Sequence, residues 1–265
     1  MGQPAALAFK AKTMINFFRR IRKQLADDNK PMKYLRYAIG EILLVVIGIL
    51  IALQVNNWNE DRKSGILEIR ILNRLRQDLV VDTLYLNDRL ERTIKQKTQQ
   101  YEFVHEIYNT QKSEKEFKKV LKLQNWDSDN LVMQTSTYEE LKNSGQINNI
   151  ENEGLKNQMI NLYREYEVAT KHFEEINGLT SREFLPAALR VGSKYYFTDL
   201  YDEERLFEGT DWKFINDPTS ESFKILEDTQ MIYYLKYDYF IGYFEKLLKK
   251  SKTLIYRIDK ELAER

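Results

Sequence analysis

The sequence predicts an all-α protein, in which a single N-terminal transmembrane helix is followed by an exported antiparallel helical bundle of three or four long helices. Three observations lead to this fold class. Residues 42–53 carry no polar side chain. Apolar residues further along recur at the three- and four-residue spacing of helices. The 265 residues include only 10 Gly and 4 Pro, which favours long helices over strands and turns.

The first segment, residues 1–36, is basic. Between residues 14 and 25, apolar side chains recur at helical spacing while Arg and Lys fill the opposite face. Such an amphipathic helix is expected to lie among membrane headgroups, and binding to a partner is the alternative. The predicted membrane-surface contacts are Phe17, Phe18, Arg19, Arg20, Arg22 and Lys23. Residues 1–13 show no pattern, so Met14 is a second candidate start.

The next segment, residues 37–55, is predicted to cross a membrane. As a helix it would span about 28 Å, close to a bilayer core of about 30 Å. Tyr37 and Trp58 stand at its ends, where aromatic rings favour the headgroup level. Two alternatives are a cleaved signal peptide and a buried helix of a soluble protein. The long basic region argues against the first, and the flanking charges and aromatic residues argue against the second.

The charges on the two sides of this span differ in sign. Residues 1–36 hold nine basic and two acidic side chains, whereas residues 56–265 hold 32 basic and 37 acidic ones. The positive-inside rule therefore predicts a cytoplasmic N-terminus and a periplasmic domain over residues 56–265, anchored in a cell inner membrane. The total of 41 basic and 40 acidic residues gives no support to nucleic-acid binding.

Three long helices are predicted in the exported domain, over residues 64–111, 151–177 and 233–258. The first carries its apolar stripe on Leu72, Leu75, Leu79, Leu86, Leu90, Ile94, Tyr101, Val104 and Tyr108. The last has alternating steps of four and three, which is typical of a bundle or coiled-coil seam. Shorter helical pieces are expected at 113–123, 137–141 and 184–189, a turn-rich stretch at 125–130, and a left-handed cap at Gly145.

Residues 192–219 have no helical period and are rich in aromatic residues. Long irregular segments in helical domains are often functional, although a packed crossover connection is the alternative. The candidate ligand or partner contacts here are Tyr195, Tyr196, Tyr201 and Trp212.

The predicted span itself contains three candidate contacts with another membrane helix. Glu41 lies about one turn inside the cytoplasmic boundary, where a carboxylate costs energy unless it pairs or reaches the headgroups. Gly48 and Ala52 form a small-xxx-small pair, which permits close approach of a second helix.

Several strings resemble one known family. They are residues 37–60, which run from Tyr37 to Glu60 through the apolar segment, residues 15–22 and residues 138–145. Together they resemble a family of uncharacterised Bacteroidota single-pass membrane proteins catalogued as a domain of unknown function, the 6090 family. The resemblance is specific over residues 14–63 and looser beyond. It implies a bacterial envelope protein anchored by its N-terminus, and it implies no activity.

No catalytic or cofactor-binding motif is present in the sequence. The absence of Cys excludes disulfides, thiolate catalysis and iron–sulfur clusters. The only histidines, His105 and His172, lack metal-ligand spacing, and P-loop, dinucleotide and serine-hydrolase motifs are missing. We therefore expect no enzyme, no cofactor and no metal.

Two functions are compatible with these features. The first is a non-enzymatic scaffold, interaction or assembly module that contacts membrane lipids and binds an envelope protein or a second copy of itself. The second is a ligand-sensing bundle that signals through a partner membrane protein. A periplasmic hydrolase without a short motif is a third, weaker class.

Overall fold

The computed structural model describes residues 31–109, 111–188, 191 and 212–265, and none of these forms a β-strand. The chain divides after Ile66 into two compact units. The amphipathic helix expected at residues 14–25, with Phe17, Phe18, Arg19, Arg20, Arg22 and Lys23, lies outside the described residues.

The described part of the first unit is the beginning of a long helix, α2, which extends over Pro31–Asn109. Pro31 begins it, at a position where the missing N–H costs nothing. Apolar side chains of the following residues are exposed, including Ile42 at 64% and Leu44 at 65%. This is the one helix of the described chain that is long and apolar enough to cross a membrane. The sequence predicted a separate helix from residue 64, but residues 56–63 contain no Gly or Pro and α2 continues through them.

The second unit contains the remainder of α2 and two further long helices. These are α5, Glu153–Leu179, and α8, Glu221–Ala263. Shorter elements join them: α3 (Glu114–Leu121), α4 (Ser136–Asn143), the 3₁₀ helices η1 (Gln146–Asn149) and η3 (Trp212–Asn216), and the π-helical turn η2 (Thr180–Phe184), with residues 185–188 also helical. Each helix predicted in this domain is found. Helix α8 begins at Glu221, twelve residues before Tyr233, the first residue of its predicted apolar seam.

Side chains fix the helix ends. Ser113 and Glu116 form a reciprocal capping box at the start of α3, in which the Glu116 carboxylate accepts the Ser113 N–H at 2.8 Å. Asn152 caps α5 by accepting the Leu155 N–H at 3.0 Å. Gly145 follows α4 with φ of 73°, so the predicted left-handed glycine is confirmed.

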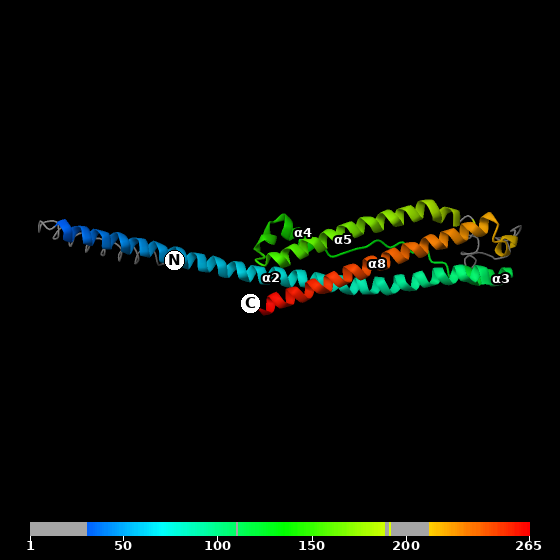
Figure 1. The fold of residues 1–265 in the computed structure, drawn as a ribbon, viewed down its shortest axis with the longest axis horizontal. Helices are drawn as coiled ribbons and strands as arrows, with labels where there is room; N and C mark the ends of the chain where they lie inside the picture. Colours follow the sequence, from blue (N-terminus) through cyan, green and yellow to red (C-terminus); the bar gives the residue numbers. More distant parts are fainter. Residues whose placement is uncertain (1–30, 110, 189–190, 192–211) are drawn as a thin grey trace, which may run out of the picture. The chain divides into compact units, whose positions relative to one another are not determined.

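The directions of the long helices differ from the expected alternation. Helix α8 is antiparallel to α2, since Lys97 pairs with Asp238 at 2.6 Å and Glu68 with Arg265 at 2.6 Å. It is also antiparallel to α5, and α2 and α5 therefore run in the same direction (Figure 1). The reason is that the chain returns from α3 to α4 as a non-helical segment, residues 122–135, which lies along the helices (Figure 1).

A shared hydrophobic core joins α2, α4, α5 and α8. Phe173 stacks on Phe240 with ring centroids 3.7 Å apart, and Tyr138 stacks on Tyr163 at 4.1 Å. The predicted stripes of α5 and α8 are buried, and most of their residues belong to this core. They are Leu155, Met159, Leu162, Tyr166, Ala169 and Phe173 in α5, and Tyr233, Tyr237, Phe240, Phe244, Leu247, Ser251, Leu254 and Ile258 in α8.

The predicted stripe of α2 is correct only in its first half. Leu72, Leu75, Leu79 and Leu86 are buried, but Ile94, Tyr101 and Tyr108 are exposed. The inward positions beyond Leu90 are instead Thr93, Gln96, Gln100, Phe103 and Ile107. Three of these five are polar, because this part of α2 faces the non-helical segment and forms hydrogen bonds with it.

Candidate functional site

The segment from residue 125 to residue 134 is extended. Asn125 contacts Gln99 and Gln100 of α2, whereas Gln134 contacts Asp82. The segment therefore covers in nine steps a stretch of α2 that is about 26 Å long at 1.5 Å per residue. This corresponds to about 2.9 Å per residue, close to the roughly 3.3 Å of a β-strand. An extended backbone among helices has no ladder partner, so side chains must satisfy its polar groups.

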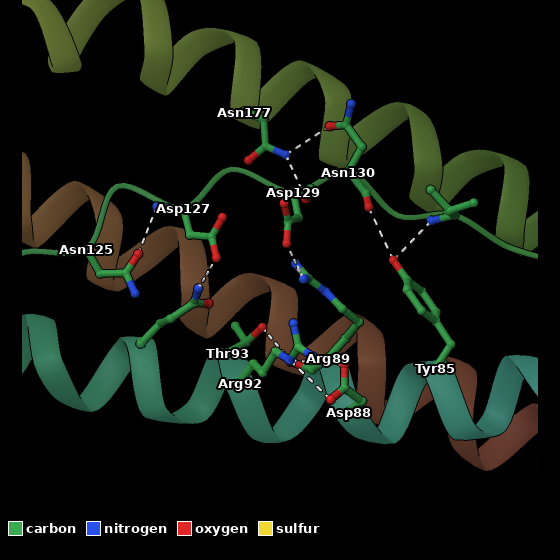
Figure 2. A network of polar contacts seen from close by, with 12 residues as sticks. Tyr85, Asp88, Arg89, Arg92, Thr93, Asn125, Asp127, Asp129, Asn130 and Asn177 are labelled. Carbon is green, nitrogen blue, oxygen red and sulfur yellow. Dashed lines mark hydrogen bonds and ion pairs between the residues drawn. The ribbon is translucent and has the colours of Figure 1, made fainter.

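Helix α2 supplies the first set of partners (Figure 2). Gln96 donates to the Asp127 carboxylate at 2.8 Å, and Gln100 donates to the carbonyl of Asn125 at 2.9 Å. Arg89, which is nearly buried, pairs with Asp129. The buried polar side chains of α2 thus bind one edge of the segment.

Helix α8 contributes a buried lysine. Lys236 is 4% exposed, and its ammonium donates to the carbonyl of Asp127 at 2.9 Å and to the Ser128 hydroxyl at 3.1 Å. It also lies over the Tyr233 ring, 4.2 Å from the centroid. Burial lowers the pKa of Lys236 to about 7, against the opposing effect of the Asp127 and Asp129 carboxylates. Because the ammonium is enclosed and bonded, it holds residues 127 and 128 in place and has no access to an external reactant.

Helix α5 contributes Asn177, which lies three residues before the π-helical turn η2 begins at Thr180. Its amide donates to the carbonyl of Asp129 at 3.1 Å and to the Asn130 side chain at 3.0 Å (Figure 2). The segment is thereby fixed between α2 and α5, with α8 contacting it as well.

From residue 129 to residue 134 the main-chain partners alternate. The Tyr85 hydroxyl of α2 donates to the carbonyl of Asn130 at 3.3 Å and accepts the N–H of Val132 at 3.2 Å. The N–H of Gln134 donates to Asp82, also on α2, at 2.8 Å. The main-chain groups of the even-numbered residues 130, 132 and 134 thus face α2. The main-chain carbonyl of Asp129, an odd-numbered residue, instead accepts a hydrogen bond from Asn177 of α5. In an extended chain successive residues direct their N–H and C=O groups to opposite edges.

The next odd-numbered residues, Leu131 and Met133, have no such partner. Within the described part of the chain, no hydrogen bond reaches the main-chain N–H or C=O of either residue. One edge of the segment is therefore paired with α2. The other has no hydrogen bond at Leu131 and Met133, and Leu131 there is 2% exposed and part of the hydrophobic core.

A hollow of about 610 Å³ lies beside this unpaired edge, between the segment, α4 and α5. Its lining includes Leu131, Met133, Tyr138, Ile160, Tyr163 and Arg164. This volume is within the usual range for binding pockets in proteins. We call this hollow, together with the adjoining residues 131–133, the edge slot.

The edge slot borders a group of buried polar side chains. Asp82 is 1% exposed, and its second carboxylate oxygen, Oδ2, has no hydrogen-bond partner among the described residues, nor has the Tyr163 hydroxyl. Burial raises the pKa of Asp82 to about 6, although the Gln134 N–H favours the ionised form. Burial likewise raises the pKa of Tyr163, so this hydroxyl stays protonated.

The rim of the edge slot carries both signs of charge. Lys142 pairs with Glu139 at 3.7 Å and Lys171 pairs with Glu167 at 2.7 Å. Arg164 forms no ion pair or hydrogen bond with the described residues. It is therefore the rim cation that remains available to an external anion.

The residues predicted from sequence lie elsewhere. Glu41 is partly exposed on α2, and Gly48 and Ala52 are exposed on the same helix. A side chain at Gly48 would meet no atom within 4 Å, so the close helix contact stays a prediction. Tyr195, Tyr196, Tyr201 and the Trp212 side chain lie outside the described residues, and a ligand role for them also stays a prediction.

Neither histidine belongs to a metal site in the described chain. His105 is exposed and stacks on Tyr101, and His172 bonds to the Tyr243 hydroxyl at 2.7 Å. No group of three or more His, Asp or Glu side chains that could hold a metal occurs among the described residues.

The extended segment was missed because residues 125–130 were interpreted as a turn-rich stretch. One signal for the segment exists in the sequence. Thr93, Gln96 and Gln100 follow the inward face of α2 and interrupt its apolar pattern, which indicates polar partners inside the domain.

Fold and site define an all-α protein with one candidate membrane span and a helical unit that encloses an extended segment. A family model described as "Family of unknown function (DUF6090)" matches residues 41–208, and the chain belongs to this family. The family predicted from the sequence is thereby confirmed. The matched residues include α3, α4, α5 and the extended segment. No curated protein and no solved structure matches the chain.

Proposed function

We propose that this protein is a non-enzymatic interaction module of the bacterial cell envelope, anchored in the inner membrane by a single span with a cytoplasmic N-terminus. The observation that carries the proposal is the exposed apolar surface of α2 over residues 42–55. A contiguous apolar surface of this length is unfavourable in water and favourable in a bilayer. The charge difference across the span supports a periplasmic position for residues 56–265.

An interaction role is supported by how the second unit uses its polar groups. The buried cation Lys236 and the buried cation Arg89 bind the extended segment and hold it in place. The edge slot, by contrast, carries Arg164 on its rim without an ion pair or hydrogen bond in the described chain. The second unit therefore leaves the rim cation Arg164 available to a partner, whereas its buried cations Lys236 and Arg89 stabilise the extended segment. Assembly with an envelope protein, or with a second copy of this chain, is the function that fits.

Reporter fusions test the topology. Alkaline phosphatase attached after Arg265 should be active in intact cells, and green fluorescent protein at the same position should not fluoresce after export through the general secretory route. Attachment of both reporters before Met14 should give the opposite result. A fluorescent C-terminal fusion with inactive phosphatase would refute the proposed topology and, with it, a periplasmic function.

Cross-linking in native membranes, followed by affinity purification, tests the interaction role. We expect one envelope protein, or a second copy of the chain, to be recovered in stoichiometric amount. A monomer without partners whose melting temperature rises with a single metabolite would instead support the ligand-sensing alternative.

A further inference from the structure

We propose that a hollow between α5 and α8 binds the phosphate monoester group of a small polar compound or of a lipid headgroup. The hollow has a volume of about 490 Å³. Its polar lining consists of Gln158 and Asn161 from α5 and of Lys246, Lys249, Lys250 and Thr253 from α8. We call it the lysine hollow. It shares no lining residue with the edge slot, so this inference goes beyond the proposed interaction function and does not depend on it.

The first argument concerns the positions of the cations. Lys246, Lys249 and Lys250 are three and four residues apart on α8, so they lie on one face of this helix. Gln158 and Asn161 are three residues apart on α5 and border the hollow from the other side. Three lysine side chains thus surround one hollow in a domain, residues 56–265, whose overall charge is negative.

The second argument concerns charge. Glu165 of α5 forms an ion pair with Lys246 at 3.3 Å and another with Lys250. Although burial favours its protonated form, the contacts with Lys250 and Lys246 lower the pKa of Glu165, so this carboxylate is ionised at neutral pH. It holds both ammonium groups in place and balances one of them. Lys249 forms no ion pair within the described residues, so the three cations and one anion leave a net charge of +2.

The third argument is the match between this charge and the ligand. A phosphate monoester carries a charge of about −1.5 to −2 at pH 7, whereas a carboxylate carries only one negative charge. Lysine is a common phosphate ligand in proteins. A phosphate monoester therefore neutralises the lysine hollow more completely than a carboxylate does.

The size and the amides of the hollow indicate the rest of the ligand. The volume of about 490 Å³ is within the usual range for small-molecule sites and exceeds the size of one phosphate group. The side-chain amides of Gln158 and Asn161 form no hydrogen bond with the described residues. Each amide can donate to and accept from hydroxyl groups. The phosphate is therefore expected to belong to a polyhydroxylated compound such as a sugar or a glycerol-based headgroup.

Isothermal titration calorimetry of the full-length protein in non-ionic detergent tests the site. The probes are glucose 6-phosphate, glucuronate and glucose, which carry a phosphate monoester, a carboxylate and no charge. We expect glucose 6-phosphate to bind at least tenfold more tightly than glucuronate, and glucose not to bind. The affinity for glucose 6-phosphate should fall as NaCl is raised, because salt screens exposed charges.

The source of the phosphate is decided with protein in phosphatidylcholine nanodiscs and added phosphatidylcholine vesicles. If phosphatidic acid in either membrane competes with glucose 6-phosphate, and the same amount of phosphatidylglycerol does not, the ligand is a lipid headgroup. Without competition, the ligand is a soluble phosphorylated compound.

Variants of the protein provide the matched comparison. Lys249→Gln removes the unpaired cation and should weaken glucose 6-phosphate binding at least fivefold. Lys252→Gln makes the same change on the same helix, but Lys252 borders a different hollow, beside Leu90 of α2, and its affinity should change less than about twofold. Asn161→Asp adds a negative charge without changing the size of the side chain and should weaken binding at least fivefold. All three side chains are exposed, and melting temperatures show that each variant is folded.

Three results would overturn the inference: no binding of glucose 6-phosphate up to about 10 mM, equal affinities for glucose 6-phosphate and glucuronate, or equal affinities of Lys249→Gln and Lys252→Gln for glucose 6-phosphate. The last result would assign any binding to the general surface charge of α8. The proposed function fails separately, because Lys249→Gln should recover the membrane partner as wild type does, whereas a cytoplasmic C-terminus refutes the interaction role without affecting calorimetry of the lysine hollow.

Discussion

Replacing Asp82 with Asn is expected to stabilise the protein at neutral pH and to leave its stability nearly unchanged at pH 4. Asp82 is buried on α2, and one of its carboxylate oxygens accepts the N–H of Gln134. Asn keeps an oxygen that can accept this bond. Its amide nitrogen replaces Oδ2, which forms no hydrogen bond with the described residues although the Tyr166 hydroxyl interacts with this carboxyl group. The substitution therefore removes the buried charge with little loss of bonding.

The magnitude follows from the pKa. Burial raises the pKa of Asp82 from its ordinary 3.8 to about 6. Between these two pH values the folded protein retains a proton that the unfolded chain has released. The free energy of unfolding therefore falls as pH rises from about 4 to about 6, and it stays low above that. Two pKa units correspond to about 3 kcal/mol, so the advantage of Asp82→Asn should grow from near zero at pH 4 toward about 3 kcal/mol at pH 7.

Urea unfolding of the full-length protein in non-ionic detergent measures this effect. Far-ultraviolet circular dichroism at pH 4, 5, 6 and 7 gives the free energy of unfolding of wild type and variant, and the difference between them isolates Asp82 from other titrating groups. Asp88→Asn is the matched control, because Asp88 lies on the same helix but is exposed and, within the described part of the chain, pairs with Arg92 alone. Its effect should be a few tenths of a kcal/mol and independent of the Asp82 titration.

A difference between wild type and Asp82→Asn that is constant from pH 4 to pH 7 would refute the reasoning. It would mean that the carboxyl group titrates at its ordinary pKa in the folded protein, and hence that water or another donor reaches it. A variant less stable than wild type at pH 7 would contradict the expected sign.

Three further outcomes are expected. Gly145→Ala should lower the free energy of unfolding by about 1 kcal/mol and Gly145→Asn by less, because φ is 73° there; equal urea midpoints for all three proteins would argue against a required left-handed residue. Phe173→Ala should cost about 3–5 kcal/mol, measured as a reduced melting temperature, and a loss below 1 kcal/mol would contradict its stacking on Phe240 in a tight core. Glu41→Gln should reduce cross-linking to a membrane partner, and unchanged recovery would remove the predicted intramembrane contact.

Helices α5 and α8 were predictable because local sequence determines what they bury. In α8, every inward position from Tyr233 to Ile258 except Lys236 and Ser251 is apolar, so periodicity identifies most of the buried face. Ser251 fits the same seam because its hydroxyl bonds to Tyr166 at 2.6 Å and to the carbonyl of Leu247.

The extended segment was not predictable in the same way. Residues 125–130 are rich in Asn and Asp, which usually indicate turns because their side chains bond to nearby main-chain groups. Here their partners come from three helices far away in sequence, including Gln96 and Lys236. No local pattern encodes such partners. For the same reason the stripe of α2 was wrong beyond Leu90, where hydrogen bonding rather than hydrophobicity decides which residues face inward.

The anchoring of residues 127–130 by three helices has an energetic consequence. Arg89 from α2, Asn177 from α5 and Lys236 from α8 each bind this stretch of four residues. Loss of any one of them loosens the segment and weakens the contacts made by the other two. The costs of substituting these three residues should therefore combine less than additively, as measured by double-mutant cycles. Although Arg89, Asn177 and Lys236 lie on different helices, they form one cooperative unit of the folded protein.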